Sequence, residues 1–446
     1  MTSTTINSPR RGFSGPDQPP EDVIRSCVHC GFCLPVCPTY RETYRERSSP
    51  RGRIWLIKAV AEGELDISDS VFQQEMSLCL NCRACEAVCP SGVKYGELVE
   101  SARAQIVRHE DQGIGARAAR KIGFEMLLGS PKATRMASHG ARIYERSGLS
   151  RLTEATGILR RVGLDHAEAI RPEMSNEFLV PGRENWPAIG PRRGTVALLA
   201  GCVMSTAFAE VHRATARVLA RNGFDVIVPL DQGCCGALSV HAGEADIGRK
   251  LARKNIDGLG GPEFDAVIVN AAGCGVAMKE YDFLLRDDPV YATKSRTFVE
   301  RVMDASEFLA QVGLTEQPGP LDVRATYQDA CHLAHAQRIT KQPRELLRAI
   351  PGLELIEMKE SDLCCGSAGI YNLLEKEMAG RLGERKVNNA LATDADLIIS
   401  ANPGCILQIR AGLEARGSNV QVEHLMTVLD RAYQNKAVAA SPAEAG

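Results

Sequence analysis

Cysteine is the residue whose number and spacing suggest chemistry in this sequence of 446 residues, which contains 16 cysteines in four groups of four. The first two groups share the spacing C-x2-C-x2-C-x3-C followed by proline, and they are Cys27, Cys30, Cys33 and Cys37, and Cys79, Cys82, Cys85 and Cys89. This is the bacterial ferredoxin pattern for [4Fe–4S] clusters, in which the fourth cysteine ligates the other cluster.

The spacing therefore predicts two [4Fe–4S] clusters with exchanged fourth ligands. The expected sets are Cys27, Cys30 and Cys33 with Cys89, and Cys79, Cys82 and Cys85 with Cys37. A pair of zinc sites is the alternative, but zinc knuckles prefer two C-x2–4-C pairs to a triple followed by Cys-Pro. Between the two groups, residues 53–65 (RIWLIKAVAEGEL) have the apolar spacing of a helix packed on the clusters.

The third and fourth groups are two copies of one unit: Cys202, Cys234, Cys235 and Cys274, and Cys331, Cys364, Cys365 and Cys405. Corresponding cysteines lie 129 to 131 residues apart, and GCCGALSVHAGE in the first copy resembles LCCGSAGIYNLL in the second. A period of this length indicates a duplicated domain rather than a solenoid of short repeats.

Strand and helix patterns alternate within each copy, and this alternation predicts parallel α/β sheets. A helix is predicted over 208–222, ending at Gly223. Short buried strands are predicted at 195–203, 225–229, 266–270, 325–330, 354–358 and 397–400. Ligands of open α/β sheets collect at the carboxyl ends of the strands, which is where Cys202, Cys274, Cys331 and Cys405 fall.

The chemistry of these two cysteine sets stays open between several interpretations. Two sets at matching offsets favour a metal or cluster site, either an iron–sulfur cluster or an all-cysteine zinc site. A buried cysteine can also act as a small hydrophobic residue, and neighbouring cysteines can form a vicinal disulfide. The glycines that follow the pairs, Gly236 and Gly366, permit the tight turn that each pair needs.

Composition excludes several classes of protein. With 53 Lys and Arg against 55 Asp and Glu, the formal net charge is −2, and aromatic residues make up 5%. Neither value suits a nucleic-acid-binding protein. No apolar run approaches the length of a transmembrane helix. We find no dinucleotide fingerprint, no Walker A loop and no Ser/His/Asp arrangement, so no catalytic residue is assigned and substrate chemistry is expected on another polypeptide.

The polar N-terminus predicts a disordered tail over residues 1–24. Arg10 and Arg11 resemble a twin-arginine export signal, but the apolar stretch that export requires does not follow them. We therefore expect a cytoplasmic chain whose thiols stay reduced.

The motif order resembles the electron-transfer subunits related to heterodisulfide reductase and, more narrowly, the iron–sulfur subunits of bacterial glycolate oxidases. The matching segments run from about residue 25 to about residue 429: CVHCGFCLPVCPTY, SPRGRIWLIKAV, CLNCRACEAVCPSGVKYGELVE, GCCGA, AGCGVAMKEY, LCCGSAGIY and ANPGC. The resemblance implies a three-part, membrane-associated complex. In it, an FAD subunit oxidises glycolate, a related second subunit supports it, and this chain passes electrons on to quinone at the cytoplasmic face of the inner membrane.

Equivalent subunits of glycerol 3-phosphate or D-lactate dehydrogenases, a thiol–disulfide reductase subunit, and a zinc-bearing scaffold are the alternatives. One departure bears on the thiol–disulfide reductase alternative. In heterodisulfide reductase, the last cysteine element of each Cys-Cys-Gly domain is Cys-x2-Cys. In this chain that element has a single cysteine, Cys274 or Cys405, and Ala271 and Asn402 lie three residues before them. Ala277 and Gln408 lie three residues after them. Four thiolates per copy suit a cubane or a zinc site better than a noncubane cluster.

We predict an α+β multidomain chain: a helical two-cluster ferredoxin-like domain, then two duplicated α/β domains with parallel sheets. The predicted segments are a tail at 1–24, the ferredoxin-like domain at 25–105, a helical connecting region at 106–192, the Cys-Cys-Gly domains at 193–318 and 319–435, and a tail at 436–446.

Several other residues are weaker candidates. His332 and His335 are read as donors beside a cluster, as proton carriers on the quinone side, or as hydrogen-bonded residues at a helix start. His29, inside the first motif, is read as a residue that tunes the cluster potential or as a partly exposed spacer. His241 and His424 are weaker, and Tyr40 and Tyr95 are read as packing residues. Residues 102–171 contain 13 Lys or Arg and 7 Asp or Glu, which suggests contact with anionic lipid or an acidic partner, or simply a solvated face.

Overall fold

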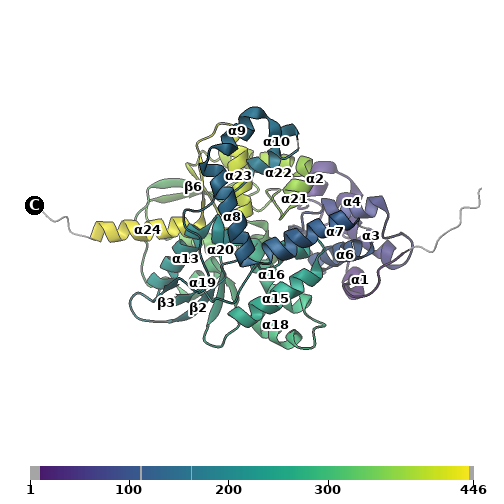
Figure 1. The fold of residues 1–446 in the computed structure, drawn as a ribbon, viewed down its shortest axis with the longest axis horizontal. Helices are drawn as coiled ribbons and strands as arrows, with labels where there is room; N and C mark the ends of the chain where they lie inside the picture. Colours follow the sequence, from purple (N-terminus) through teal and green to yellow (C-terminus); the bar gives the residue numbers. More distant parts are fainter. Residues whose placement is uncertain (1–10, 111–112, 162, 441–446) are drawn as a thin grey trace, which may run out of the picture.

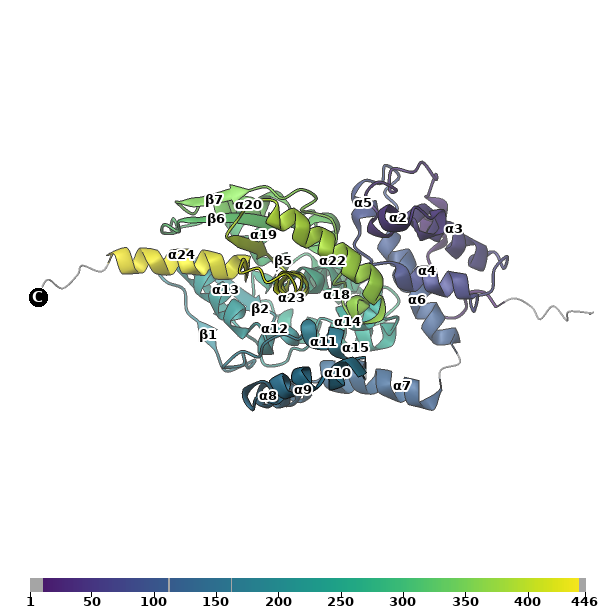
Figure 2. The same cartoon turned by 90° about the horizontal axis from the view of Figure 1, so that it is seen from above.

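A computed structural model describes residues 11–110, 113–161 and 163–440 of the chain. The N-terminal helical domain lies at one end of the molecule and the two Cys-Cys-Gly domains form the larger body beside it (Figure 1). The connecting helices run as a separate layer along one side of both (Figure 2). This arrangement agrees with the predicted fold class.

The N-terminal domain is built from helices around one apolar core that includes Ile57, Phe72 and Leu98. Helix α3 corresponds to the helix predicted over 53–65 and begins earlier, at a proline. Ser49 caps it, because the Ser49 hydroxyl accepts a hydrogen bond from Gly52 N at 3.0 Å. The elements are α1 (Glu21–Arg25), α2 (Pro38–Thr43), η1 (Glu46–Ser48), α3 (Pro50–Ala61), α4 (Ser70–Leu78), α5 (Ala84–Ala87) and α6 (Tyr95–His109).

Residues 11–24 differ from the predicted disordered tail. Ile67 N donates to Arg11 O at 2.9 Å, and Asp17 accepts from Arg249 at 2.7 Å. Part of the segment is helix α1, and Ile24 is buried in the core. Because these contacts are long-range, the polar composition of the segment gave no sign of them. Residues 1–10 lie outside the described part of the chain.

The first Cys-Cys-Gly domain contains a five-stranded sheet in the order β1-β3-β2-β4-β5, parallel except for β1, which pairs antiparallel with β3. Its elements are β1 (Asn185–Trp186), β2 (Gly194–Leu198), α12 (Val203–Thr206), α13 (Ala209–Arg221), β3 (Phe224–Ile227), α14 (Ala237–His241), α15 (Ala245–Leu259), β4 (Ala266–Val269), α16 (Ala272–Lys279), α17 (Tyr281–Leu284), α18 (Tyr291–Val299), β5 (Val302–Asp304) and α19 (Ala305–Val312).

The second Cys-Cys-Gly domain repeats this sheet without the β1 equivalent, in the all-parallel order β7-β6-β8-β9. The same strand order in both copies is the structural form of the sequence repeat. Its elements are β6 (Val323–Gln328), η3 (His332–Ala336), α20 (Lys341–Arg348), β7 (Leu353–Ile356), α21 (Tyr371–Leu374), α22 (Lys376–Leu391), β8 (Leu397–Ser400), α23 (Pro403–Glu414), β9 (Gln421–His424) and α24 (Leu425–Ala440).

The six predicted strands are present, with ends that differ by a few residues. The largest difference is at 195–203, where the strand ends at Leu198 and the chain turns into α12, so Cys202 lies after the strand. Strands β1, β5 and β9 were not predicted. Strands β1 and β5 have two and three residues, which is too short to show an alternation. Strand β9 has four residues, but Val422 is the only apolar one.

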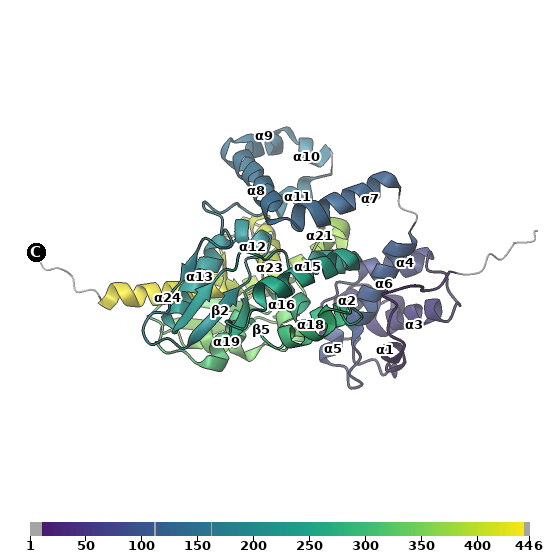
Figure 3. The same ribbon diagram turned by 60° about the horizontal axis from the view of Figure 1, so that its bottom comes forward.

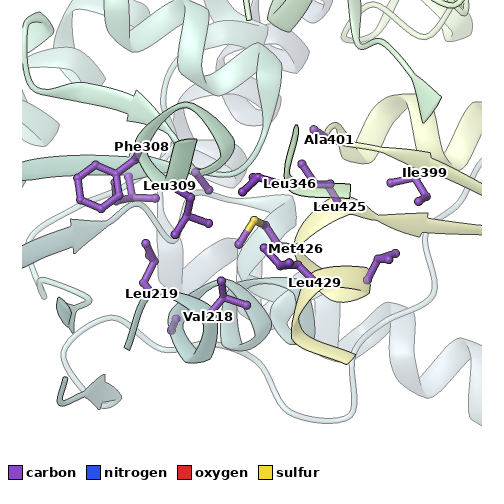
Figure 4. Close-up of a cluster of buried hydrophobic side chains, with 14 of the residues drawn as sticks. Val218, Leu219, Phe308, Leu309, Leu346, Ile399, Ala401, Leu425, Met426 and Leu429 are labelled. Atoms are coloured by element: carbon purple, nitrogen blue, oxygen red, sulfur yellow. The ribbon is translucent and has the colours of Figure 1, made fainter. Parts of the chain in front are cut away.

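The two copies share one apolar core, drawn in Figure 4. Val218 and Leu219 of α13 in the first copy pack with Met426 and Leu429 of α24 in the second. Helix α24 continues to Ala440, so residues 436–440 are helical and not part of the predicted C-terminal tail. Residues 441–446 lie outside the described residues.

The described part of the connecting region consists of helices joined by turns up to Ala169 and of irregular backbone between Ala169 and β1. Its elements are α7 (Ile114–Arg120), η2 (Lys121–Leu128), α8 (Pro131–Arg146), α9 (Leu149–Thr156), α10 (Ile158–Arg161) and α11 (Asp165–Ala169). The predicted boundary at 192 is too late, because β1 already belongs to the first sheet. Among the described residues, no helix is long and apolar enough to cross a membrane.

Candidate metal centres

The loop between α1 and α2 places three cysteines beside Cys89. Cys27, Cys30, Cys33 and Cys89 line one pocket, which Cys85 also borders. Cys30 is exposed, whereas burial raises the pKa of the Cys33 thiol to about 11. Four thiols around one pocket are the donor set of a [4Fe–4S] cluster, so these residues fit that group.

A second pocket is lined by Cys37, Cys79, Cys82 and Cys85, all of them buried. Cys37 precedes α2, Cys79 follows α4 and Cys85 lies in α5, so three helix ends position the set. The two pockets thus combine the cysteines as the ferredoxin spacing predicts, with Cys37 and Cys89 exchanged. This second set also fits a [4Fe–4S] cluster.

Arg53 is a buried cation at the second pocket, with 1% of its surface exposed. Its Nη1 donates to Thr39 Oγ1 at 3.1 Å and its Nε donates to the backbone oxygen of Glu75 at 2.7 Å. Thr39 Oγ1 in turn lies 3.3 Å from Cys37 Sγ. Arg53 Nη2 also pairs with the buried carboxylate of Glu75 at 3.3 Å, so uncharged and charged oxygens hold the guanidinium within a short distance of a candidate ligand.

The sulfur of Cys79 has polar neighbours as well. Tyr95 donates its hydroxyl to Cys79 Sγ at 3.4 Å, and Asn81 N donates to the same sulfur at 3.4 Å. Burial acts to raise the pKa of the Cys79 thiol, but the charges of Arg53 and Arg103 outweigh it and lower that pKa. Tyr95, read from sequence as a packing residue, is buried and also acts as a hydrogen-bond donor to this sulfur.

All eight cysteines of the Cys-Cys-Gly domains line a single cavity of about 470 Å³. Within each copy, neighbouring thiols perturb one another. Cys331 Sγ lies 3.9 Å from Cys364 Sγ, and contact with the Cys234 thiol, followed by burial, raises the pKa of Cys202. The cavity is large enough for a metal or cluster, and thiols are donors for both iron–sulfur clusters and zinc, but no three of the described side chains in it are gathered closely enough for a single metal ion.

The fold places these cysteines at the carboxyl ends of strands, as the strand pattern predicts. Cys202 and Cys331 precede α12 and η3, and Cys274 and Cys405 lie in the first turns of α16 and α23. Helix N-termini favour negative charge and so favour thiolates.

The turn after each cysteine pair requires glycine. Gly236 and Gly366 have φ values of +85° and +87°, which residues other than glycine rarely adopt. At Gly366 a Cβ would also lie 2.6 Å from the backbone oxygen of Ala379 in α22. The glycine of the Cys-Cys-Gly motif is therefore explained by the local backbone.

The second ferredoxin pocket adjoins the second Cys-Cys-Gly set. Cys82 and Cys364 share an apolar cluster against which Cys331 packs. Burial raises the pKa of the Cys82 thiol, and the neighbouring Cys331 raises it further. His332 Nε2 bonds to Asn81 O at 2.9 Å across the same junction. The two cysteine sites therefore lie on either side of one domain interface.

The histidines have mainly structural contacts. His332 and His335 bond to backbone oxygens, and burial lowers the pKa of His332 to about 3. His424 bonds to Asn270 O at 2.9 Å, and burial lowers its pKa to about 4. These contacts agree with the bonded-residue interpretation. His29 has a left-handed φ of +55° in the first cysteine loop.

Sequence reasoning missed a buried polar network at the same interface. Arg83, 2% exposed, donates to Glu86 at 2.9 Å and to Glu280 of the first Cys-Cys-Gly domain at 3.1 Å. Glu100 accepts from Asn81 at 2.7 Å and lies 3.0 Å from His241 Nδ1. Asn81 and Arg83 are spacer positions of the cysteine motif, so only their tertiary partners distinguish them.

A second missed feature is Asn402, whose side chain donates to Cys405 Sγ at 3.4 Å. From the sequence, Asn402 is noticed only because it stands where heterodisulfide reductase has a second cysteine. Among the described residues, no three His, Cys, Asp or Glu side chains are gathered closely enough to hold a single metal ion.

Three family models match the chain. A 4Fe-4S dicluster domain matches residues 23–93, a cysteine-rich domain matches residues 196–279 and 325–410, and the linker region of the glycolate oxidase iron-sulfur subunit matches residues 115–170. A probable glycolate oxidase iron-sulfur subunit of Bacillus subtilis is 42% identical over 93% of this chain and 95% of that protein. The chain belongs to the family of glycolate oxidase iron–sulfur subunits.

Other members and relatives of this glycolate oxidase subunit family support the assignment. The glycolate oxidase iron-sulfur subunit of Escherichia coli is 33% identical over 93% of this chain and 96% of that protein. A fumarate reductase (CoM/CoB) subunit of Methanothermobacter marburgensis is 28% identical over 93% of this chain and 75% of that protein. The resemblance stated from sequence is thus confirmed, and the chain is an iron–sulfur electron-transfer subunit.

Proposed function

We propose that this chain conducts electrons within a glycolate-oxidising complex. An FAD-containing partner oxidises glycolate to glyoxylate and releases two electrons and two protons. The electrons pass through this chain towards a quinone, which takes up two electrons and two protons to become the quinol. A second, related subunit completes the complex, which sits at the cytoplasmic face of the inner membrane. The named relatives in Bacillus subtilis and Escherichia coli support the substrate.

The observation that carries the electron-transfer role is the order of the cysteine sites. The first set reaches the surface at Cys30, the second set is buried, and Cys82 of that set adjoins Cys331. The cavity beyond Cys331 contains the remaining cysteine sets. Such an order joins a surface that a donor can reach to an enclosed interior.

In this proposal the eight ferredoxin cysteines hold two [4Fe–4S] clusters, and the Cys-Cys-Gly cysteines hold a further cluster or zinc. Clusters bound there would supply one-electron transfer. The residues of this chain keep the second site dry and surround its sulfurs with hydrogen-bond donors. Arg53 adds a positive charge, which favours the more negative, reduced state of that site.

D-lactate is a second candidate substrate for the partner. Lactate utilization protein A of Shouchella clausii is 30% identical over 53% of this chain and 98% of that protein. Glycolate is favoured because the glycolate oxidase relatives match over 93% of the chain.

The first test is anaerobic purification of the complex from its host, followed by addition of glycolate while the visible absorbance of the clusters is recorded. We expect bleaching with glycolate. Bleaching with D-lactate but not with glycolate, in a preparation that contains flavin and responds to dithionite, would reject glycolate and retain electron transfer. If no substrate of the partner reduces the clusters, electron transfer from the flavin partner to this chain would be rejected.

The ligand assignment is tested by Cys30→Ser, with Cys235→Ser as the matched control. We expect Cys30→Ser to remove or alter one ferredoxin-type EPR signal of the reduced protein, and Cys235→Ser to leave both in place. An unchanged spectrum in Cys30→Ser would exclude Cys30 as a ligand.

A further inference from the structure

The connecting helices expose an unusual number of large apolar side chains. Of the 19 such side chains exposed in the described part of the chain, nine lie between residues 122 and 164. Met136 is 74% exposed and Ile143 is 67% exposed. Scattered exposed apolar residues are normal, but a concentration of this kind marks a binding surface.

Helix α8 has its apolar and polar faces reversed with respect to a helix that packs on a core. Met136 and Ile143, seven residues apart, lie on one face of the helix and are exposed. Thr134 and Ser138 are the buried residues of α8. The apolar stripe continues in the next helices with Leu149, Leu152 and Ile158.

Polar contacts attach this layer to the body. Arg120 donates to Glu244 at 2.6 Å, and Glu125 accepts from Lys250 at 2.7 Å. Arg142 donates to the backbone oxygen of Asn176 at 2.6 Å. The helices project from the Cys-Cys-Gly body in Figure 3 and form its separate lower layer in Figure 2. Among the described residues of these helices Phe124 is buried, whereas Met136, Ile143 and the other large apolar side chains of the outer face stay exposed.

Cations accompany the apolar stripe. Lys121, Lys132, Arg151, Arg160 and Arg161 are exposed, and none forms an ion pair with another residue that the structure describes. The acidic residues Glu125, Glu145 and Glu168, by contrast, are engaged by Lys250 or Arg171. The uncompensated charge of this surface is therefore positive.

We propose that the outward face of residues 121–153 and 155–161 binds the surface of an anionic lipid bilayer. Short helices with exposed Leu, Ile and Met flanked by Lys and Arg lie in the headgroup plane, where apolar burial and attraction to anionic lipid act together. Aromatic side chains are enriched at protein–protein interfaces, and none of the exposed large apolar side chains in the described part of this face is aromatic, so the unpaired cations favour an anionic lipid surface. The inference rests on the proposed function and deepens it, because it names the face of this chain that would lie against the membrane in which the quinone acceptor is found.

The test is co-sedimentation of the full chain, carrying its clusters, with vesicles of phosphatidylglycerol and phosphatidylcholine, and with vesicles of phosphatidylcholine alone. We expect binding to the anionic vesicles that weakens at high salt. The double variant Met136→Glu, Ile143→Glu should bind at least about tenfold more weakly, because two apolar side chains are lost from the contact. The matched control, Trp55→Glu with Val290→Glu, changes similarly exposed residues elsewhere and should bind like the wild type.

Three results would overturn the inference. The wild-type chain stays in the supernatant with anionic vesicles, the Met136→Glu, Ile143→Glu variant (the linker variant) binds as well as the wild type, or both double variants lose binding equally. Loss of association with the purified flavin partner in the linker variant, with vesicle binding intact, would assign the face to a protein instead. Cluster absorbance and its bleaching by dithionite are recorded in the same samples, so failure of the proposed electron-transfer role is seen separately.

Discussion

Arg53→Met tests whether the second ferredoxin site holds a redox cluster whose potential this chain sets. The substitution removes a buried positive charge and keeps a side chain of similar length. Arg53 Nη1 lies 3.1 Å from Thr39 Oγ1, which lies 3.3 Å from Cys37 Sγ, so the guanidinium nitrogen cannot be farther from that sulfur than these two distances combined. The cation therefore acts on the site at close range.

The size of the effect follows from Coulomb's law. One unit charge at about 6 Å in an effective dielectric of about 20 contributes about 3 kcal/mol. For a one-electron couple, 59 mV corresponds to a factor of ten, or about 1.4 kcal/mol, so the midpoint potential should fall by roughly 100 mV. The potential falls because the positive charge stabilises the reduced, more negative state. The other cluster should keep its potential.

The assay is an EPR-monitored redox titration of the purified chain, with visible absorbance to confirm cluster content. Arg53→Lys keeps the charge and should restore most of the potential. Glu75, which is 2% exposed, also pairs with Arg47 at 3.1 Å, and Arg53→Met combined with Glu75→Gln separates the loss of the cation from the carboxylate left behind. A midpoint potential in Arg53→Met equal to that of the wild type, at full cluster content, would refute the reasoning.

Three further substitutions give defined outcomes. Burial lowers the pKa of His212 from 6.5 to about 4, so the unfolded state takes up the proton first and this histidine alone should lower stability by about 2 kcal/mol between pH 7.5 and 5. His332 and His424 act in the same direction, so His212→Gln should reduce the slope by that share in urea unfolding followed by circular dichroism. Gly366 has a φ of +87°, and the Cβ added by Gly366→Ala would lie 2.6 Å from Ala379 O. The substitution should therefore lower the free energy of unfolding by about 1–3 kcal/mol in the same assay, whereas an unchanged value would show that the turn relaxes. Asp430→Asn breaks the pair with Arg217 at 2.7 Å that joins the two copies, and should cost about 1–2 kcal/mol; an unchanged urea midpoint would mean that the apolar core alone holds the copies together.

The sequence determined the cysteine sets and the repeat, because both are local or periodic. The ferredoxin spacing predicts three cysteines of one motif together with the fourth of the other, and the pockets bring Cys37 and Cys89 together with the expected partners. The repeat predicted two copies of one sheet, and the strand orders agree. Long buried strands such as β6 were recognisable, whereas β1 and β5, with two and three residues, were not.

Tertiary structure alone decided which sites are neighbours. Cys82 and Cys331 are separated by 249 positions in the sequence, and no pattern in either motif shows that they adjoin. The burial of Arg53, the network around Arg83 and the packing of residues 11–24 depend in the same way on long-range contacts. The outward apolar face of α8 also required the structure, because periodicity shows that a helix has two faces but not which of them the rest of the chain covers.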